Sequence, residues 1–348
     1  MSSEVIQADR LFEIGNAYRR AKVLLSAVEL DVFSTLAAGP LDATALATQI
    51  DVHQRAALDF FDALVAIGLL SRDAGGRYQN AAESDCYLDK AKPTYLGASF
   101  DQYNRREYVM WGSLTNALRT GKPAAQTNGH DHFESLYDDP VRFRTFVTAM
   151  TSGSMLAARA IAERFAWEKY KTLCDVGAAQ GCLPVQVAAH HHHISAIGFD
   201  LPSLRPAFEQ YACESGVAER LSFHAGDFFK DPLPSADVIV FGRVLHNWDL
   251  ATKKMLLAKA HQALPEGGAV IVYDMLIDDD RRSNANGLLS SLNMLLWTAG
   301  GFGYTGSDCA GWLHSAGFNQ TSIQPLPGGN SMIVGQRSTV MNTALPTG

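Results

Sequence analysis

Leu173–Gly181 reads L-C-D-V-G-A-A-Q-G, and this stretch decides the fold. It is a short apolar run that ends in an acid and a turn with two glycines, and a helical pattern follows at 183–189. An open α/β sheet forms a ligand crevice where a strand ends in such a turn and the chain passes into a helix. Gly177 and Gly181 let the backbone approach a ligand closely, and the helix N-terminus supplies free N–H groups. We therefore expect a cofactor at this turn.

Two classes of cofactor compete for a turn of this kind. The dinucleotide fingerprint G-x-G-x-x-G, counted from Gly177, requires glycines at 179 and 182, where the chain has Ala179 and Cys182. S-adenosylmethionine (SAM) carries an ammonium group and a carboxylate, which suit the Asp175 side chain and the exposed backbone amides beside it. The stretch favours SAM over a dinucleotide and leaves a turn without a ligand as the third alternative.

Composition and charge exclude several classes of protein. The 348 residues suffice for two domains, and 47 % hydrophobic and 19 % charged residues are typical of a globular protein. A net charge of −7 argues against nucleic acid or an anionic membrane as a partner. The five cysteines form no C-x-x-C pair, which predicts neither disulfides nor a zinc site and suits a reducing cytoplasm. No apolar run reaches the ~18 residues of a membrane span, and we expect a soluble cytoplasmic protein.

The N-terminal segment has the order of a winged-helix module. Apolar residues at helical spacing cover 11–38 and end at Gly39-Pro40, and helical patterns follow at 43–50 and 54–67. Two short strand patterns, at 69–72 and 77–79, then flank a glycine pair.

Because winged-helix modules often bind DNA, a regulator is the non-enzyme alternative. Residues 40–90 carry eight acidic and four basic side chains, and Asp59 and Asp62 lie on the second helix. These acids would repel phosphates, so we expect no nucleic acid as a partner and expect the module to pack against another subunit.

The alternation of strands and helices after residue 166 predicts an α/β domain with a Rossmann-like sheet. Apolar runs at 172–176, 194–199, 221–224, 238–244 and 269–273 are separated by helical segments, which is typical of parallel strands. Two further runs at 321–324 and 331–335 flank a turn rich in proline and glycine and read as an antiparallel pair. The sheet is therefore expected to have seven strands.

The remaining boundaries follow from composition. We expect the winged-helix domain at 1–95, a helical linker at 96–165 that is interrupted by a loop at 120–132, the cofactor-binding domain at 166–337 and a disordered tail at 338–348. The linker is rich in aromatic residues and methionines, most of which should pack in the core. Some should line an acceptor pocket, since pockets favour domain junctions. The residues expected there are Tyr103, Met110, Trp111 and Met150, together with Asn293, Met294 and Trp297 of a later helix.

Polar residues follow the strands of the predicted sheet. Asp200 closes the second strand, where an acid can accept hydrogen bonds from a ribose diol, and Asp227-Phe228 closes the third, where adenine could bind. Each acid alone could be a helix cap. His246 lies just beyond the fourth strand, where an imidazole can take a proton at physiological pH, with a core or capping histidine as the alternative. The four histidines at 190–193 point in different directions on a helix, and we expect no metal there.

These motifs together resemble the SAM-dependent O-methyltransferases of the plant caffeic acid and bacterial antibiotic-tailoring type. The likeness extends over about residues 10–337 and rests on five motifs in order: Asp175–Gly181, Asp200-Leu201-Pro202, Gly226–Phe229, Leu245–Trp248 and Leu264–Gly268. It implies a winged-helix dimerisation domain joined to a class I methyltransferase domain, a homodimer, SAM as the cofactor and a small-molecule methyl acceptor.

The resemblance also implies roles for individual residues. Asp200, followed by Leu201, would bind the ribose hydroxyls, and Asp227 and Phe228 the adenine. Ser154 and Arg243 would lie near the methionine end of the cofactor, although Arg243 could equally be a solvated charge. His246 would be the general base.

Three departures from the family pattern bear on these roles. Ala178 and Ala179 replace two glycines and narrow the room for the cofactor, and Asn247 replaces an aspartate. The family also has a glutamate shortly after a late Gly-Gly pair, which hydrogen-bonds the base, whereas Gly300-Gly301 is followed by Phe302-Gly303. Asp308 or Asn330 is the expected substitute.

Because the glutamate that would hydrogen-bond the base is missing, the sequence does not decide which atom of the acceptor is methylated. The primary hypothesis is transfer to the hydroxyl of a small aromatic molecule. The runner-up is S-methylation of a thioether acid such as methylthio-hydroxybutyrate, where a sulfur lone pair attacks without deprotonation, and relatives that methylate nitrogen or carbon are also known.

Overall fold

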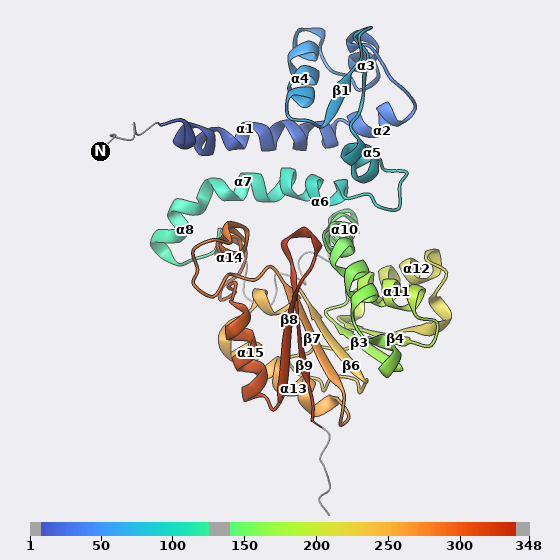
Figure 1. Cartoon of the computed structure of the whole chain (residues 1–348), viewed down its shortest axis with the longest axis vertical. Helices are drawn as coiled ribbons and strands as arrows, with labels where there is room; N and C mark the ends of the chain where they lie inside the picture. The colour runs from blue at the N-terminus through green and yellow to red at the C-terminus, as the bar shows by residue number, and fades with distance from the viewer. Residues whose placement is uncertain (1–7, 125–139, 339–348) are drawn as a thin grey trace, which may run out of the picture. The chain divides into compact units, whose positions relative to one another are not determined.

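The computed structural model describes residues 8–124 and 140–338 (Figure 1). Most of the loop expected at 120–132 and all but the first residue of the tail expected at 338–348 lie outside the described residues. The chain forms two compact units, Met1–Val109 and Met110–Gly348, and each is described by itself. None of the described helices is long and apolar enough to cross a membrane.

The first unit contains the predicted winged helix. Its elements are α1 (Asp9–Glu29), α2 (Val32–Ala37), α3 (Ala43–Gln49), α4 (Gln54–Ala66), β1 (Leu70–Arg72), β2 (Tyr78–Asn80), α5 (Ala82–Leu88), α6 (Gly97–Gln102) and the π-helical η1 (Tyr103–Glu107). β1 and β2 pair antiparallel, and Phe33, Phe61 and Tyr78 are completely buried between hairpin and helices. The helical stretch predicted at 11–38 is broken at Asp31, which has a φ of 62°, a conformation that aspartate tolerates better than most residues.

The second unit contains the predicted seven-stranded sheet. Its elements, after α7 (Tyr108–Met110) at the boundary, are η2 (Trp111–Ser113), α8 (Leu114–Thr120), α10 (Pro140–Arg164), η3 (Trp167–Lys169), β3 (Thr172–Val176), α11 (Cys182–His190), β4 (Ser195–Asp200), η4 (Pro202–Leu204), α12 (Arg205–Glu214), η5 (Ala218–Arg220), β5 (Leu221–Ala225), β6 (Val238–Gly242), η6 (Leu245–Asn247), α13 (Leu250–Ala263), β7 (Ala269–Asp274), α14 (Ala285–Trp297), α15 (Gly306–Ser315), β8 (Gln320–Pro325), η7 (Pro327–Gly329) and β9 (Ser331–Gln336). The strand order is β5-β4-β3-β6-β7-β9-β8. The first five are parallel to one another, whereas β9 is antiparallel to both of its neighbours.

Helices cover both faces of this sheet, and the alternation of side chains along each strand decides which face a residue serves. Val238 and Val240 of β6 pack in one cluster with residues of α10 and α11. Ile239 and Phe241 pack in the other, with residues of α13 and α15. Because β6 is buried on both faces, it reads as a continuous apolar run rather than an alternating one.

Candidate active site

The carboxyl ends of four adjacent strands bring the polar residues of the sheet to one edge. In the order β4-β3-β6-β7, Asp200 and Asp274 end the two outer strands, Asp175 lies one residue before the end of β3, and Arg243 follows β6. Parallel strands end at the same edge, so Asp175 and Arg243, 68 positions apart in sequence, come to the ends of adjacent strands.

The turn between β3 and α11 has the geometry that its glycines predict. Gly177 and Gly181 have φ values of 78° and 84°, which non-glycine residues rarely adopt. A Cβ on Gly177 would lie 2.7 Å from Val244 Cγ2, and one on Gly181 would lie 2.5 Å from Phe208 Cε2. Ala179 adopts a φ of 48°, a strained value that its amide, donating to Asp200 Oδ2 at 2.8 Å, helps to hold.

A cavity of about 520 Å³ opens at this edge, a size that is usual for small-molecule sites. Among its lining residues are these sequence-predicted ones: Met150, Ser154, Asp175, Gly177, Asp200, Leu201, Asp227, Phe228 and Arg243. Ala178, Ala179 and Asn247 also line it. Gly181, by contrast, caps α11 and lies against Phe208.

Two carboxyl groups line this cavity, that of Asp175, which is buried, and that of Asp200, which is half-buried. Burial raises the pKa of Asp175 to about 7, and the neighbouring Asp200 adds to the shift. Burial also raises the pKa of Asp200 to about 6, although its oxygens accept the amides of Ala179 and Leu201 at 2.8 and 2.7 Å. A cationic ligand in the cavity would favour the ionised form of both acids. Their carboxylate oxygens could then accept hydrogen bonds from the ammonium group and the ribose diol of a sulfonium nucleoside.

Three aromatic side chains, Phe228, Phe229 and Trp248, form one wall of the cavity. The rings of Phe229 and Trp248 lie 4.8 Å apart, and those of Phe228 and Phe229 lie 4.7 Å apart. The backbone beneath them is fixed, because Asp227 Oδ1 accepts the amide of Phe229 at 2.9 Å and Lys259 Nζ donates to the Phe228 carbonyl at 2.6 Å. The wall offers the apolar face that a purine base requires.

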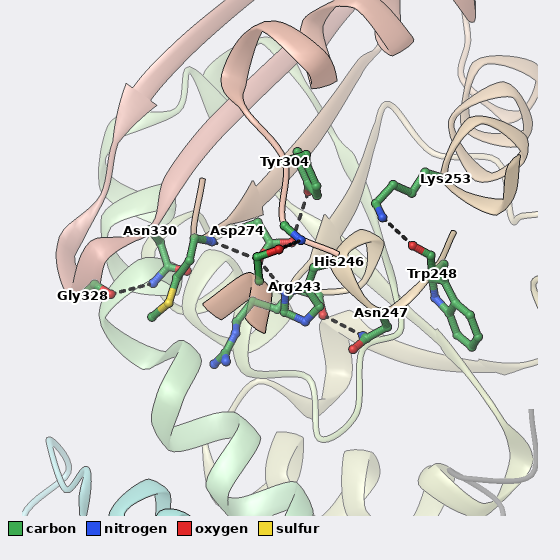
Figure 2. A network of polar contacts seen from close by, with 12 residues as sticks. Arg243, His246, Asn247, Trp248, Lys253, Asp274, Tyr304, Gly328 and Asn330 are labelled. Carbon is green, nitrogen blue, oxygen red and sulfur yellow. Dashed lines mark hydrogen bonds and ion pairs between the residues drawn. The ribbon is translucent and has the colours of Figure 1, made fainter. Parts of the chain in front are cut away.

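His246 is not among the residues that line the cavity, although Val244 and Asn247 of the same turn are, and its imidazole pairs with a carboxylate. The strand pattern predicted to reach 244 ends at Gly242, because Arg243 has a φ of 55° and turns the chain into η6. Asn247 Nδ2 donates to the Arg243 carbonyl at 3.2 Å, which closes this turn. His246 is 7 % exposed, and its Nδ1 lies 2.7 Å from Asp274 Oδ1 (Figure 2). Assigned from this contact, Nδ1 carries the hydrogen and Nε2 the lone pair.

Asp274 is held ionised although it is fully buried. Burial raises the pKa of its carboxyl, but the contact with His246 and the charge of Arg243 lower it, and the net shift is downward. Its Oδ2 accepts the hydroxyl of Tyr304 at 3.1 Å, and its Oδ1 also accepts the Met275 amide at 2.9 Å. The carboxylate therefore has three donors, which fix its orientation toward His246.

The sequence-based expectation for the partner of His246 was wrong. Asp308 forms a capping box with Thr305 at the start of α15, and Asn330 donates to the Gly328 carbonyl at 3.3 Å. The residue that takes this place is Asp274, which sequence reasoning missed. The sequence holds one local signal, since Asp274 directly follows the apolar run 269–273, but its contact with His246 depends on the pairing of β7 with β6.

The expected acceptor residues are brought together in part. Trp111 Nε1 donates to Asn293 Oδ1 at 3.1 Å, which joins η2 to α14, and Met294 on α14 is buried. Trp297 ends the same helix, and Met110 precedes Trp111. Tyr103 belongs to the first unit.

Two of the histidines at 190–193 hydrogen-bond backbone carbonyls. His191 Nε2 and His193 Nε2 lie 2.7 and 3.1 Å from the carbonyls of Ala162 and Trp167. Within residues 8–124 and 140–338, no three His, Cys, Asp or Glu side chains are grouped to hold a metal ion.

Known proteins resemble the chain over nearly its whole length. The profile of the O-methyltransferase domain matches residues 111–319, and that of the O-methyltransferase dimerisation domain matches residues 12–90. The tetracenomycin polyketide synthesis 8-O-methyl transferase TcmO of Streptomyces glaucescens is 39 % identical over 94 % of this chain and 96 % of its own. The N,N-dimethyltransferase OxyT of Streptomyces rimosus is 40 % identical over 79 % of this chain and 80 % of its own. The crystal structure of human N-acetylserotonin methyltransferase in complex with SAM superposes with a TM-score of 0.88 at 29 % identity, covering 97 % of this chain and all of that one.

The raised pKa of Asp175 predicts that the folded protein loses stability as the pH rises toward neutrality. Because the pKa of Asp175 is raised to about 7, the folded protein keeps a proton that the unfolded chain has lost, and the free energy of unfolding falls as pH rises from about 4 to about 7. Asp175→Asn should flatten this slope in urea unfolding without added ligand. The exposed Asp59→Asn is the matched control and should keep the wild-type slope. Equal slopes in wild type and Asp175→Asn would contradict the prediction.

Proposed function

This chain belongs to the SAM-dependent O-methyltransferases, and we propose that its acceptor is the phenolic hydroxyl of a small aromatic molecule, which His246 deprotonates. The family membership follows from the matched domain profiles and from 39 % identity to TcmO over nearly the full length. The observation that carries the proposal for the site is the pair of His246 and Asp274, 2.7 Å apart, whose histidine lies on a turn that lines the cofactor cavity with Val244 and Asn247.

SAM is the cofactor, and it supplies the methyl group when bound. We propose that Asp200 holds the ribose hydroxyls, that Asp227 and Phe228 border the adenine, and that Asp175 lies near the cationic end. All four line the cavity. Ser154 and Arg243, which line the cavity as well, would hold the methionine carboxylate. The proposed acceptor-binding residues remain Tyr103, Met110, Trp111, Met150, Asn293, Met294 and Trp297.

His246 is proposed to act through Nε2. With Nδ1–H directed at Asp274, Nε2 is free to accept the proton of an acceptor hydroxyl, and the buried carboxylate stabilises the imidazolium that forms. A phenol with a pKa near 10 does not transfer its proton fully to an ordinary imidazole before reaction, so proton transfer accompanies methyl transfer and contributes a factor of ~10²–10⁴. Alignment of the two reactants can contribute more, ~7–11 kcal/mol.

The pair of His246 and Asp274 also helps to choose between a hydroxyl and the alternative acceptors, a thioether or an amine. A thioether acceptor would suit a histidine without an orienting acid, whereas His246 has Asp274 as its partner. The similarity to OxyT is an observation in favour of nitrogen. An amine attacks with its own lone pair, however, so a histidine oriented by a buried carboxylate fits a hydroxyl better. The acidic charge of the winged helix speaks against a DNA-binding regulator.

The first unit is proposed to mediate a homodimer. It contains the matched dimerisation domain, and the first half of α1 exposes four large hydrophobic side chains: Leu11 (74 %), Phe12 (68 %), Ile14 (62 %) and Tyr18 (53 %). Such a cluster on one helix is typical of an interface. The five cysteines are free, which supports the cytoplasm as the proposed location.

The base is tested with an acceptor found by screening. Phenols, thioethers and amines are incubated with SAM, and release of S-adenosylhomocysteine is followed; we expect turnover of a phenol. His246→Ala should then lower kcat by ~10²–10⁴, with the dissociation constant of SAM unchanged in calorimetry. His314→Ala, at an exposed position of α15, is the control. A variant at 246 that turns over as fast as wild type would exclude His246 as the base.

The interface is tested by light scattering after size exclusion. Phe12→Glu places a charge in the exposed cluster of α1 and should convert the dimer to a monomer. Ile323→Glu, on the edge strand β8 and 48 % exposed, should leave the dimer intact. A wild-type monomer, or a dimer of undiminished affinity in Phe12→Glu, would contradict the proposed interface.

A further inference from the structure

Lys253 on α13 is completely buried, with 0 % of its surface exposed. Lysine is almost never in this state unless it is paired. Its ammonium group donates to the carbonyl of Trp248 (Figure 2). The same group lies 3.3 Å from the ring centroid of Phe302. The ring centroid of Tyr304 is 5.7 Å away. No step of the mechanism described above uses this cation.

The contacts of Lys253 reach both segments that hold the base. Trp248 follows the turn that carries His246, and its amide donates to the Leu245 carbonyl at 3.1 Å within that turn. Phe302 and Tyr304 lie on the segment before α15, and Tyr304 donates to Asp274. This is the segment where the sequence lacks the expected glutamate. Lys253 therefore contacts both the residue that follows the turn of His246 and the segment whose tyrosine holds Asp274.

The charges around Lys253 indicate that it remains a cation near neutral pH. Burial lowers its pKa to about 8, while the carboxylates of Asp274 and Asp249 and the thiol of Cys309 oppose that shift. Asp249 caps α13 near the surface, so Asp274 is the buried anion of this set. Arg243, which follows β6, and the hydroxyl of Tyr304 face the carboxylate of Asp274 from other elements.

We propose that Lys253 is a positioning residue for His246, which balances the buried charge of Asp274 and fixes the two segments that carry the pair. The inference rests on the proposed function, since His246 is the base of that reaction. Its physical consequence concerns protonation. Without the cation, Asp274 loses a favourable interaction and the imidazolium of His246 loses a repulsion, so His246 holds its proton more tightly. A histidine that is already protonated cannot act as a base.

The test compares three variants of the full-length protein. Lys253→Met keeps the length of the side chain and removes the charge, and replacing a buried charge by an apolar group of similar volume is commonly tolerated by the fold. Lys253→Gln also removes the charge but keeps a donor for the Trp248 carbonyl, and it reports the same effect if the methionine variant does not fold. Lys254→Met is the matched control, because Lys254 is the exposed neighbour on the same helix.

The measurement is ¹⁵N NMR of histidine-labelled protein at a fixed pH of about 6.5, near the ordinary titration of imidazole. The signal of His246 is assigned by its loss in His246→Ala. In both variants at position 253 we expect the ratio of protonated to neutral His246 to rise at least ~2-fold over wild type, with no change in Lys254→Met.

Two results would overturn the proposal. One is an unchanged ratio in Lys253→Met. The other is a change in the methionine variant that is absent from Lys253→Gln, since both lack the charge. A purely structural role would lower the yield of folded protein without moving this ratio. This NMR measurement needs no methyl acceptor. A protein that methylates none of the screened phenols would refute the proposed function, and the ratio of protonated to neutral His246 could still be measured in it.

Discussion

The parallel pairing of β4, β3, β6 and β7 is the constraint on which the site depends. Four strands that run in one direction end at one edge, and each end supplies one polar group: Asp200, Asp175, Arg243 and Asp274. A slip of one residue between β6 and β7 would turn every side chain of the slipped strand to the other face of the sheet. The register is held by the apolar side chains of β6 and β7, which are buried on both faces. The core thus determines the geometry of the site.

Burial then determines the electrostatics. Asp175 and Asp200, which line the cavity, have a raised pKa, whereas Asp274, which is more deeply buried than either, has a lowered one. The difference lies in the partners: Asp274 has His246, Tyr304 and the charge of Arg243, while Asp175 has only the repulsion of Asp200 among its neighbours that shift its pKa. The cavity acids are therefore suited to receive a cation, and Asp274 is suited to orient a base. One sheet edge accommodates both tasks because the partners come from different strands.

Most elements of the fold and several residues of the site could be predicted from the sequence, because their signals are local. The glycine turn, the acids after the second and third strands, His246 and the seven strands each depend on a few consecutive residues. The partner of His246 could not be predicted in the same way, since Asp274 is 28 positions away and meets it only through the pairing of β6 with β7. Tyr304 and Lys253 were missed for a related reason. A tyrosine and a helical lysine give no local signal of burial, and only the packing of α13 against the segment before α15 encloses them.

The proposed base, His246, takes its orientation from a carboxylate on the neighbouring strand. The most direct test is Asp274→Asn, which keeps the shape of the side chain and removes its charge, with methyl transfer to a phenolic acceptor measured by S-adenosylhomocysteine release. The account predicts that kcat falls at least ~100-fold, because neither the tautomer nor the imidazolium of His246 is then supported, while SAM binds as tightly as before. A kcat equal to that of wild type would contradict it.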